Sequence, residues 1–315
     1  MKLLKKSFFK EVFSLLGDTF SEFSKDSAMK MGASLAYYTI FSIAPLLLIV
    51  IWVVGFIYGE ILAGGQDAQT EVFQEFTDLF GPDTAAQLQQ IIRNISLSNK
   101  SGLGIAIGIG TLIIGSTTIF MEIQDSLNRI WGVRPKPKKG WLKMLLNRAI
   151  SFSMVLGLGF LLIASLIANG IILALSSEFA RYFPEISVYV VQWVNLGLTF
   201  LVITCLFGFI FRFLPDARMR FRDVVWGAVF TAALFMLGRY LIALYMLYSA
   251  PASAYGAAGA IIILLLWIYY SAAILYFGAE FTKVYARRYG RGVWPSSYAV
   301  KVRLIEEEVE DEPID

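Results

Sequence analysis

The chain has 315 residues, of which 57% are hydrophobic and only 16% are charged, and its mean hydropathy is +0.65. Soluble domains carry about 25% charged residues, so the excess of apolar residues has to face either a large core or lipid, and the length of the apolar runs decides between the two. The single cysteine, Cys205, excludes an internal disulfide and a multi-cysteine metal site, and the sequence contains no histidine. The net charge of +3 is small, so the distribution of charges along the chain is more informative than their sum.

Residues 1–30 predict an amphipathic N-terminal helix. The segment begins with lysines, but no short apolar region with a cleavage site follows, so we expect no cleaved signal peptide. The pattern fits two arrangements: a helix lying in the membrane interface, or a helix packed on the rest of the protein. The apolar residues that recur at helical spacing are Phe8, Phe9, Val12, Leu15, Leu16, Phe20 and Phe23.

Six apolar stretches are long enough to cross a membrane as helices. A helix needs about 20 residues, at roughly 1.5 Å each, to cross a ~30 Å hydrocarbon layer. None of the stretches shows the two-residue alternation of an outer-membrane barrel. The sequence therefore predicts an all-α integral membrane protein whose membrane domain occupies residues 31–285, with spans near 33–58, 103–121, 149–175, 188–211, 224–248 and 256–282.

Two further segments lie outside the predicted spans. Residues 59–102 predict an external helical hairpin, because apolar residues recur at helical spacing on both sides of Gly81 and Pro82. Its apolar stripes need a partner surface, which favours a cap over a central cavity above a merely packed loop. Residues 286–315 predict a cytoplasmic tail with a disordered acidic end from Glu306 onwards.

The basic residues predict the orientation of the bundle. The N-terminal and C-terminal segments and the loops after the second and fourth spans contain all Lys and Arg except Arg93, Lys100, Arg181 and Arg239. The first three of these lie in the opposite loops, and the fourth lies inside a span. By the positive-inside rule the basic side is cytoplasmic, so both ends of this multi-pass protein are expected in the cytoplasm.

Arg239 is the basic residue inside a span. It lies about 15 residues beyond the inner start of the fifth span, hence roughly 20 Å deep. A charge there costs at least about 2.5 kcal/mol, so we expect it to face the bundle interior and to have a partner. The partner is either an anionic substrate group, which the planar guanidinium fork suits, or a structural acceptor such as backbone carbonyls, tyrosines or Glu60.

Glu280 is the acidic candidate of the last span. It lies about 24 residues from the outer start of that span, roughly 36 Å along the axis, and is therefore too far from Arg239 to pair with it. We expect a structural ion pair with Arg148, Arg212 or Lys283. A proton-coupling role stays open, because a partly buried carboxyl can acquire a raised pKa.

Polar groups in the first and fourth spans complete the set of candidate pathway residues. Pro45 lies about 12 residues into the first span and cannot donate the helical hydrogen bond to Phe41. Interrupted helices at mid-membrane often line transport sites, although a packing kink and interhelical hydrogen bonds also explain such residues. The other candidates are Tyr37, Tyr38, Ser42, Asn195 and Thr199.

Four blocks of sequence resemble the YihY/BrkB family of membrane proteins, some of which were historically labelled ribonuclease BN. The blocks are GASLAYYTIFSIAPLL at 32–47, LNRIWGV at 127–133, FRFLPDARMRFRDVVWGA at 211–228 and YGAAGAIIILLLWIYYSAAILYFGAEFTKVY at 255–285. The resemblance covers about residues 28–285. It implies six spans in a bacterial inner membrane, and links to virulence, to export of lipid or lipopolysaccharide precursors, and to cation/proton exchange.

Together these features predict an inner-membrane transporter or exporter of an anionic amphiphile or lipid-like substrate. A cation/proton exchanger and a non-transporting membrane scaffold are the alternatives. We expect no enzymatic activity, catalytic residue, cofactor, metal or nucleic-acid partner, since zinc-dependent RNA hydrolysis normally needs clustered histidine and carboxylate ligands. The expected partners are membrane lipids and an anionic lipid or small-molecule substrate, and a homo-oligomer is left open.

Overall fold

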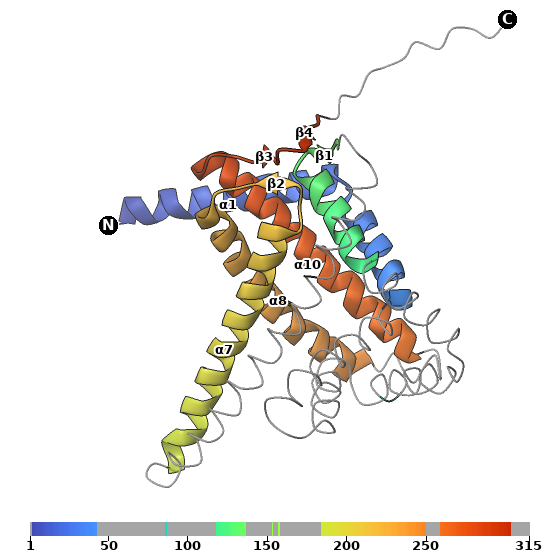
Figure 1. The fold of residues 1–315 in the computed structure, drawn as a ribbon. Helices are drawn as coiled ribbons and strands as arrows, with labels where there is room; N and C mark the ends of the chain where they lie inside the picture. The colour runs from blue at the N-terminus through green and yellow to red at the C-terminus, as the bar shows by residue number, and fades with distance from the viewer. Residues whose placement is uncertain are drawn as a thin grey trace, which may run out of the picture.

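The computed structural model describes residues 2–42, 118–136, 184–249 and 259–303, together with the isolated positions 86, 153 and 157. Apart from those isolated positions, the predicted hairpin at 59–102, the third span and the acidic C-terminal end lie outside the described residues. The described helices are α1 (Lys2–Lys25), α7 (Pro184–Phe213), α8 (Phe221–Ser249) and α10 (Gly259–Tyr289), and residues 28–42 and 118–130 are also helical (Figure 1).

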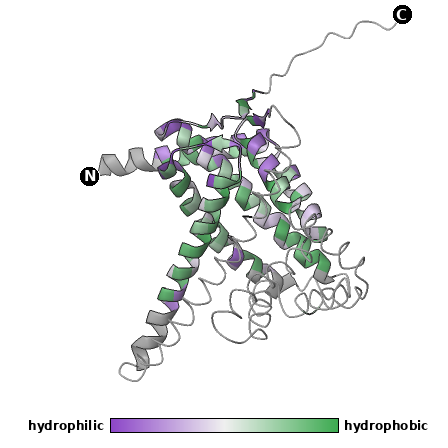
Figure 2. Cartoon of the chain, in the orientation of Figure 1, coloured by the Kyte–Doolittle hydropathy of each residue, from purple (hydrophilic) through white to green (hydrophobic). Residues whose placement is uncertain are grey.

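Three stretches of these helices are long and apolar enough to cross a membrane. They are Gln192–Phe213 in α7, Phe221–Ile242 in α8 and Ile261–Tyr289 in α10. Hydrophobic residues follow one another along all three helices (Figure 2). These stretches coincide with the fourth, fifth and sixth predicted spans, so the described residues support a helical membrane protein with several spans.

Helices α8 and α10 pack closely because a glycine of each faces a threonine of the other. A Cβ added to Gly227 would collide with Thr282, and one added to Gly278 would collide with Thr231. Each threonine hydroxyl donates to a carbonyl of its own helix, over 2.7 Å from Thr231 to Gly227 and over 2.6 Å from Thr282 to Gly278. Membrane helices use such small-residue contacts because lipid provides no hydrophobic force between them.

In the described part of the chain, four short strands join the ends of three helices. Strand β1 (Val133–Pro135) follows helix 118–130, β2 (Ala217–Arg218) follows α7, and β3 (Trp294–Pro295) and β4 (Ala299–Lys301) follow α10. Strand β1 pairs antiparallel with β4, and β2 pairs antiparallel with β3. These strands are not predictable from the sequence, because two or three residues are too few to show a periodic pattern.

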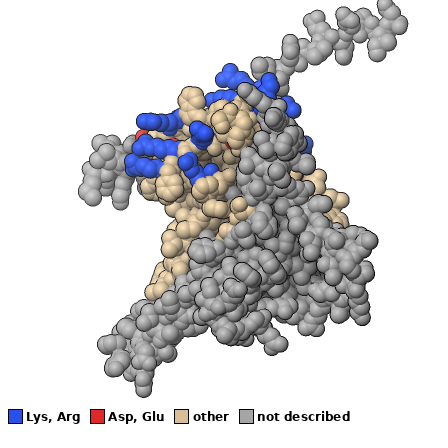
Figure 3. Space-filling view, viewed as in Figure 1, with Lys and Arg blue, Asp and Glu red and all other residues tan. Residues whose placement is uncertain are grey.

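The strands mark one end of the molecule, which we call the strand end. Lysine and arginine side chains gather there in the space-filling view (Figure 3). They include Arg134 of β1, Arg218 of β2 and Lys301 of β4. The structure thus brings the basic loops after the second and fourth predicted spans together with the basic C-terminal segment, as a common side of a membrane requires.

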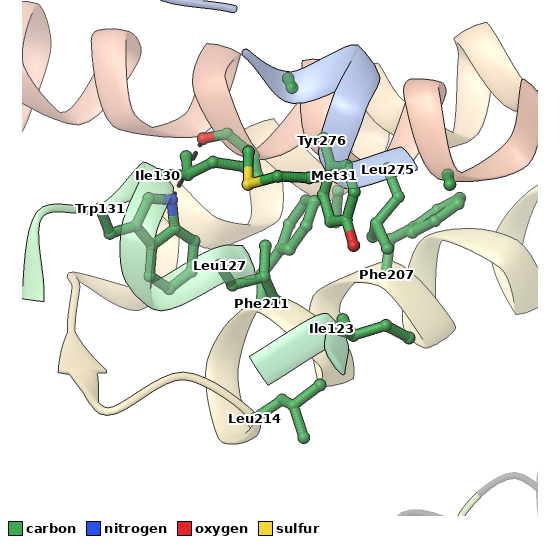
Figure 4. Packing of buried hydrophobic residues seen from close by; sticks show 14 of the residues in the cluster. Met31, Ile123, Leu127, Ile130, Trp131, Phe207, Phe211, Leu214, Leu275 and Tyr276 are labelled. Carbon is green, nitrogen blue, oxygen red and sulfur yellow. Dashed lines mark hydrogen bonds between the residues drawn. The ribbon is translucent and has the colours of Figure 1, made fainter. Parts of the chain in front are cut away.

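A hydrophobic core fills the interior near the strand end. Trp131 is buried, and its indole Nε1 donates to the carbonyl of Ala279 in α10 over 3.2 Å (Figure 4). Its ring meets Phe211 edge to face, with centroids 6.2 Å apart. Tyr276 and Leu127 are fully buried in the same cluster. The sequence block LNRIWGV therefore packs the loop after helix 118–130 against α7 and α10.

A buried aspartate ties the loop after α7 to helix 118–130. Asp216 is 1% exposed, and it accepts hydrogen bonds from Asn128 at 3.0 Å and from Gln124 at 3.4 Å. Its backbone N–H donates to the side-chain oxygen of Asn128 over 2.8 Å, and its carbonyl accepts from the backbone N–H of Ser296 over 3.0 Å. Such bonds offset the desolvation of a buried carboxylate. Asp216 is thus a structural connection between three segments.

We predict that Gly227→Ala destabilises the protein, because the new Cβ collides with Thr282 and forces α8 and α10 apart. The expected loss is about 1–3 kcal/mol, as for other overpacked sites. Thermal unfolding in detergent measures it. Gly197→Ala in α7 is the matched control, since no atom lies within 4 Å of the added Cβ. Equal unfolding temperatures for the two variants would contradict the close helix contact.

Candidate functional site

Four charged side chains meet where α1 and the turn after it lie against α10 near the strand end. Lys283 Nζ lies 2.8 Å from Glu22 Oε2, 2.9 Å from Asp26 Oδ2 and 2.7 Å from Glu280 Oε2. Lys283 is 3% exposed and Glu280 is 0% exposed. We call Glu22, Asp26, Glu280 and Lys283 the acid–lysine cluster. Lys283 is one of the three basic partners that the sequence predicts for Glu280.

Helix spacing explains why these residues meet. Acids of α1 and the turn after it are spaced four residues apart at Asp18, Glu22 and Asp26, which places them along one side. Basic residues of α10 face them, with Arg287 3.3 Å from Glu22 and Arg288 2.9 Å from Asp18. The two rows have opposite charge, so ion pairs hold α1 on α10 along several helical turns.

Apolar contacts support the same docking. Leu15 of α1 packs in a small buried cluster with Phe281 and Val284 of α10. The structure thus shows the packed arrangement of the N-terminal helix. The opposite side of α1 is apolar as well, because Phe13 is 72% exposed and Phe20 is 64% exposed. These two rings remain available to a membrane interface, so the packed and interfacial arrangements are compatible.

The charges within the cluster are unevenly compensated. Burial by itself would raise the pKa of Glu22, but the hydrogen bond from Lys283 and the charges of Lys283 and Arg287 outweigh it, so this pKa lies below its ordinary value. Glu280 has less support: its Oε2 lies 2.7 Å from the Lys283 ammonium as an ion pair, but neither of its carboxyl oxygens has a hydrogen-bond partner within the described residues. A fully buried carboxyl oxygen without a donor is costly when the group is ionised.

The three acids have the spacing of a cation site. One carboxylate oxygen from each of Glu22, Asp26 and Glu280 lies within 4.8 Å of the others. The Lys283 ammonium contacts all three acids, and so the protein supplies the cation itself. A metal ion would have to displace this ammonium.

Arg239 lies elsewhere, in the apolar span Phe221–Ile242 of α8. Its side chain is exposed, and within the described ranges it makes no hydrogen bond or ion pair. It does not pair with Glu280, which agrees with the depth argument from the sequence. The neighbouring residues Leu237, Tyr240 and Leu241 are also exposed, so the guanidinium stands in an apolar surface.

The other sequence candidates form no joint site with Arg239 in the described structure. Tyr37 and Tyr38 are exposed and their rings meet edge to face, whereas Ser42 is buried. Asn195 is exposed on α7 and Thr199 is half-buried. Pro45 lies outside the described residues. No hydrogen bond between described residues joins any of these side chains to Arg239.

Glu22 and Asp26 were not among the predicted site residues. Their four-residue spacing was visible in the sequence, but the same pattern fits any solvated helix face. Their role depends on which helix packs against α1, and only the tertiary structure shows this. The fully buried Lys283 was foreseen only as one of several partners for Glu280.

Comparison with known proteins gives membrane proteins from several bacteria. A UPF0761 membrane protein of Azotobacter vinelandii is 27% identical over 269 residues, which cover 83% of this chain and 60% of the relative. Relatives from Idiomarina loihiensis and Vibrio vulnificus are 32% and 29% identical, over 64% and 81% of this chain and 67% and 76% of their own length. This chain thus spans less than two thirds of the Azotobacter relative.

No solved structure matches the chain. The family model described as virulence factor BrkB matches residues 19–297, which include α7, α8 and α10 entirely and the acid–lysine cluster. The four sequence blocks that resemble this family fall within the matched range. The chain therefore belongs to the BrkB family of membrane proteins.

Proposed function

We propose that this protein is a transporter or exporter in the bacterial inner membrane, and that its substrate is an anionic amphiphile of lipid type. Arg239 carries the proposal. It is an exposed guanidinium in an apolar membrane-spanning stretch, without an acid partner among the described residues. A charge at that depth costs at least about 2.5 kcal/mol unless something neutralises it. A phosphate or carboxylate of the substrate would do so with two parallel hydrogen bonds.

The surroundings of Arg239 favour an amphiphile over a small hydrophilic anion. Exposed apolar side chains adjoin it on α8, at Leu237 and Leu241, and others lie on α7, at Trp193 and Leu196. Helices α7 and α8 meet at the strand end and diverge away from it (Figure 1). An amphiphile would match both the charge and the apolar surfaces: its headgroup would bind the guanidinium, and its chains would lie along the exposed apolar side chains. A bare cation would be repelled by Arg239.

The two alternatives differ in which residues they use. A cation/proton exchanger would rely on the acid–lysine cluster, because it contains the buried carboxyl of Glu280. A membrane scaffold would need neither Arg239 nor the cluster to contact a substrate. We propose no catalytic residue, cofactor or nucleic-acid contact, since the basic side chains at the strand end also suit anionic lipid headgroups.

We further propose that the strand end faces the cytoplasm. The gathered lysines and arginines there follow the positive-inside rule (Figure 3). Helix α1 would then lie at the inner interface, with Phe13 and Phe20 in the lipid and with its acids on α10. Both chain termini would be cytoplasmic, and membrane lipids would be direct partners.

We predict that Arg239→Ala abolishes transport of an anionic lipid while the protein still folds. The assay uses proteoliposomes with fluorescent phosphatidylglycerol, and with fluorescent phosphatidylcholine for comparison. Loss of a charged hydrogen-bonded pair, worth about 1.5–3 kcal/mol, lowers the transport rate by about tenfold or more. Arg239→Lys keeps the positive charge but loses the planar guanidinium. Its transport rate is expected to lie between those of the wild type and Arg239→Ala.

Arg291→Ala is the control, because Arg291 is exposed at the strand end and has no predicted substrate contact. Thermal unfolding of each variant in detergent accompanies the assay. Unchanged phosphatidylglycerol transport by Arg239→Ala would contradict the proposal, and so would a variant that no longer folds, since that result assigns Arg239 a structural role.

Cysteine labelling tests the orientation. In a Cys205→Ala background, Ser297→Cys lies exposed between β3 and β4 and Gln192→Cys lies exposed at the opposite end of the α7 span. A membrane-impermeant maleimide should label the cysteine at 192 in intact spheroplasts, and the cysteine at 297 only in inside-out vesicles. The reverse pattern would place the strand end outside.

A further inference from the structure

The acid–lysine cluster contains a fully buried acid, Glu280, whose only charged contact among the described residues is the ammonium that it shares with Glu22 and Asp26. Glu280 is 0% exposed, and neither of its carboxyl oxygens has a hydrogen-bond partner in the described part of the chain. Asp26 and Glu22 supply further carboxylate oxygens within 4.8 Å. Acid groups so close to one another repel when all are ionised, and an ionised carboxylate is acceptor-only. With all three acids ionised, the described residues of the cluster therefore lack one positive charge or one hydrogen-bond donor.

Counting the charged groups gives the excess of negative over positive charge in the cluster. Three carboxylates face the ammonium of Lys283, and Arg287 adds a second positive charge beside Glu22, 3.3 Å away on the exposed side. Within the described residues this count leaves one negative charge in excess. We assign it to Glu280, because Glu280 is the fully buried acid and neither of its oxygens accepts a hydrogen bond there, whereas Glu22 contacts both cations and Asp26 accepts a hydrogen bond from Lys283 over 2.9 Å.

We propose that the acid–lysine cluster is a proton-binding site, in which Glu280 carries one proton directed toward Asp26, and that this proton keeps α1 docked on α10. Protonation removes the uncompensated charge and converts Glu280 into a donor. A metal ion is the less suitable ligand, since the Lys283 ammonium already contacts all three acids.

Loss of the proton has a structural consequence. A third ionised carboxylate would then adjoin Glu22 and Asp26, which belong to α1 and the turn after it. Repulsion would act between α10 and this segment, and the ion pairs of Lys283 would be redistributed among three full charges. Docking of the C-terminal half of α1 should therefore weaken as the pH rises and Glu280 is deprotonated.

The groups that bear on this titration are few. Within the described residues, the charged groups that act on Glu280 are Asp26 from the turn after α1 and Lys283 from its own helix, with Glu22 of α1 completing the cluster. Glu22 stays ionised at neutral and alkaline pH because its pKa lies below the ordinary value. A lysine ammonium ordinarily titrates near pH ~10.4, so a test range from about pH 6 to about pH 9 leaves the lysine charged.

Infrared spectroscopy of the full chain in detergent tests the proton directly. We expect a protonated carboxylic acid band at neutral pH that shifts in heavy water, diminishes toward about pH 9 and is absent from Glu280→Gln. Asp18→Asn is the control, because Asp18 pairs with Arg288 outside the cluster over 2.9 Å and should leave the band unchanged. A spectrum in which wild type and Glu280→Gln show no difference in this band would overturn the proposal.

Two further outcomes are decisive. Glutamine reproduces the shape and neutrality of a protonated glutamate, so a Glu280→Gln variant that fails to fold would also overturn the proposal. Measurements in sodium-containing and in sodium-free choline buffer should give the same band. A band that appears only without sodium would assign the site to a metal cation instead.

Hydrogen exchange tests the coupling to α1. Between about pH 6 and about pH 9, amides of residues 10–25 should exchange increasingly faster in wild type than in Glu280→Gln, by up to about tenfold per pH unit for one proton. At residues 201–213 of α7, the ratio of the exchange rates in wild type and Glu280→Gln should not change with pH. This ratio corrects for a general loss of stability. A ratio at residues 10–25 that does not change with pH would refute the coupling. Neither test involves Arg239, so the transport proposal stands or falls separately.

Discussion

A charged group inside a membrane protein has to meet an opposite charge, reach water or lose its charge, and this constraint organises the structure described here. Near the strand end the protein satisfies the constraint from within: Lys283 contacts three acids, and Asp216 collects hydrogen bonds from two other segments. In the α8 span it does not, because Arg239 has no such partner among the described residues. The contrast distinguishes charged groups that connect segments of the fold from Arg239, which we propose binds the substrate.

The same contrast appears in the packing. Toward the strand end, paired glycine and threonine residues bring α8 and α10 together, Trp131 fastens the loop before β1 to α10, and four short strands connect the helix ends. Away from it, α7 and α8 carry exposed apolar side chains and diverge (Figure 1). A closely packed strand end with diverging helices beyond it fits the proposed amphiphile that enters from lipid. In the proposed account, a change in the protonation of Glu280 would alter the contact between α1 and α10.

Much of this fold follows from the sequence, because lipid imposes a simple rule on length and hydrophobicity. The three described spans coincide with the predicted ones, and depth along the helix correctly kept Glu280 away from Arg239. Of the acid–lysine cluster, only the pairing of Glu280 with Lys283 was among the predicted contacts, because Glu22 and Asp26 reach Lys283 only when α1 lies on α10. The strands were too short to show periodicity. Asn128 and Gln124 gave no sign that their partner is Asp216, which lies 88 and 92 positions further along the chain. Local patterns thus predict elements, whereas polar contacts between distant segments require the tertiary structure.

The central claim is that the Arg239 guanidinium binds an anionic headgroup inside the membrane. Solid-state magnetic resonance on reconstituted protein, with labelled arginine and with phosphorus observed in phosphatidylglycerol, measures that contact directly. The claim predicts dipolar coupling at hydrogen-bonding range between guanidinium and lipid phosphorus, present in the wild type and lost in Arg239→Lys while other arginine signals remain. Equal coupling in both proteins, or coupling of Arg239 to a protein carboxylate instead, would contradict it.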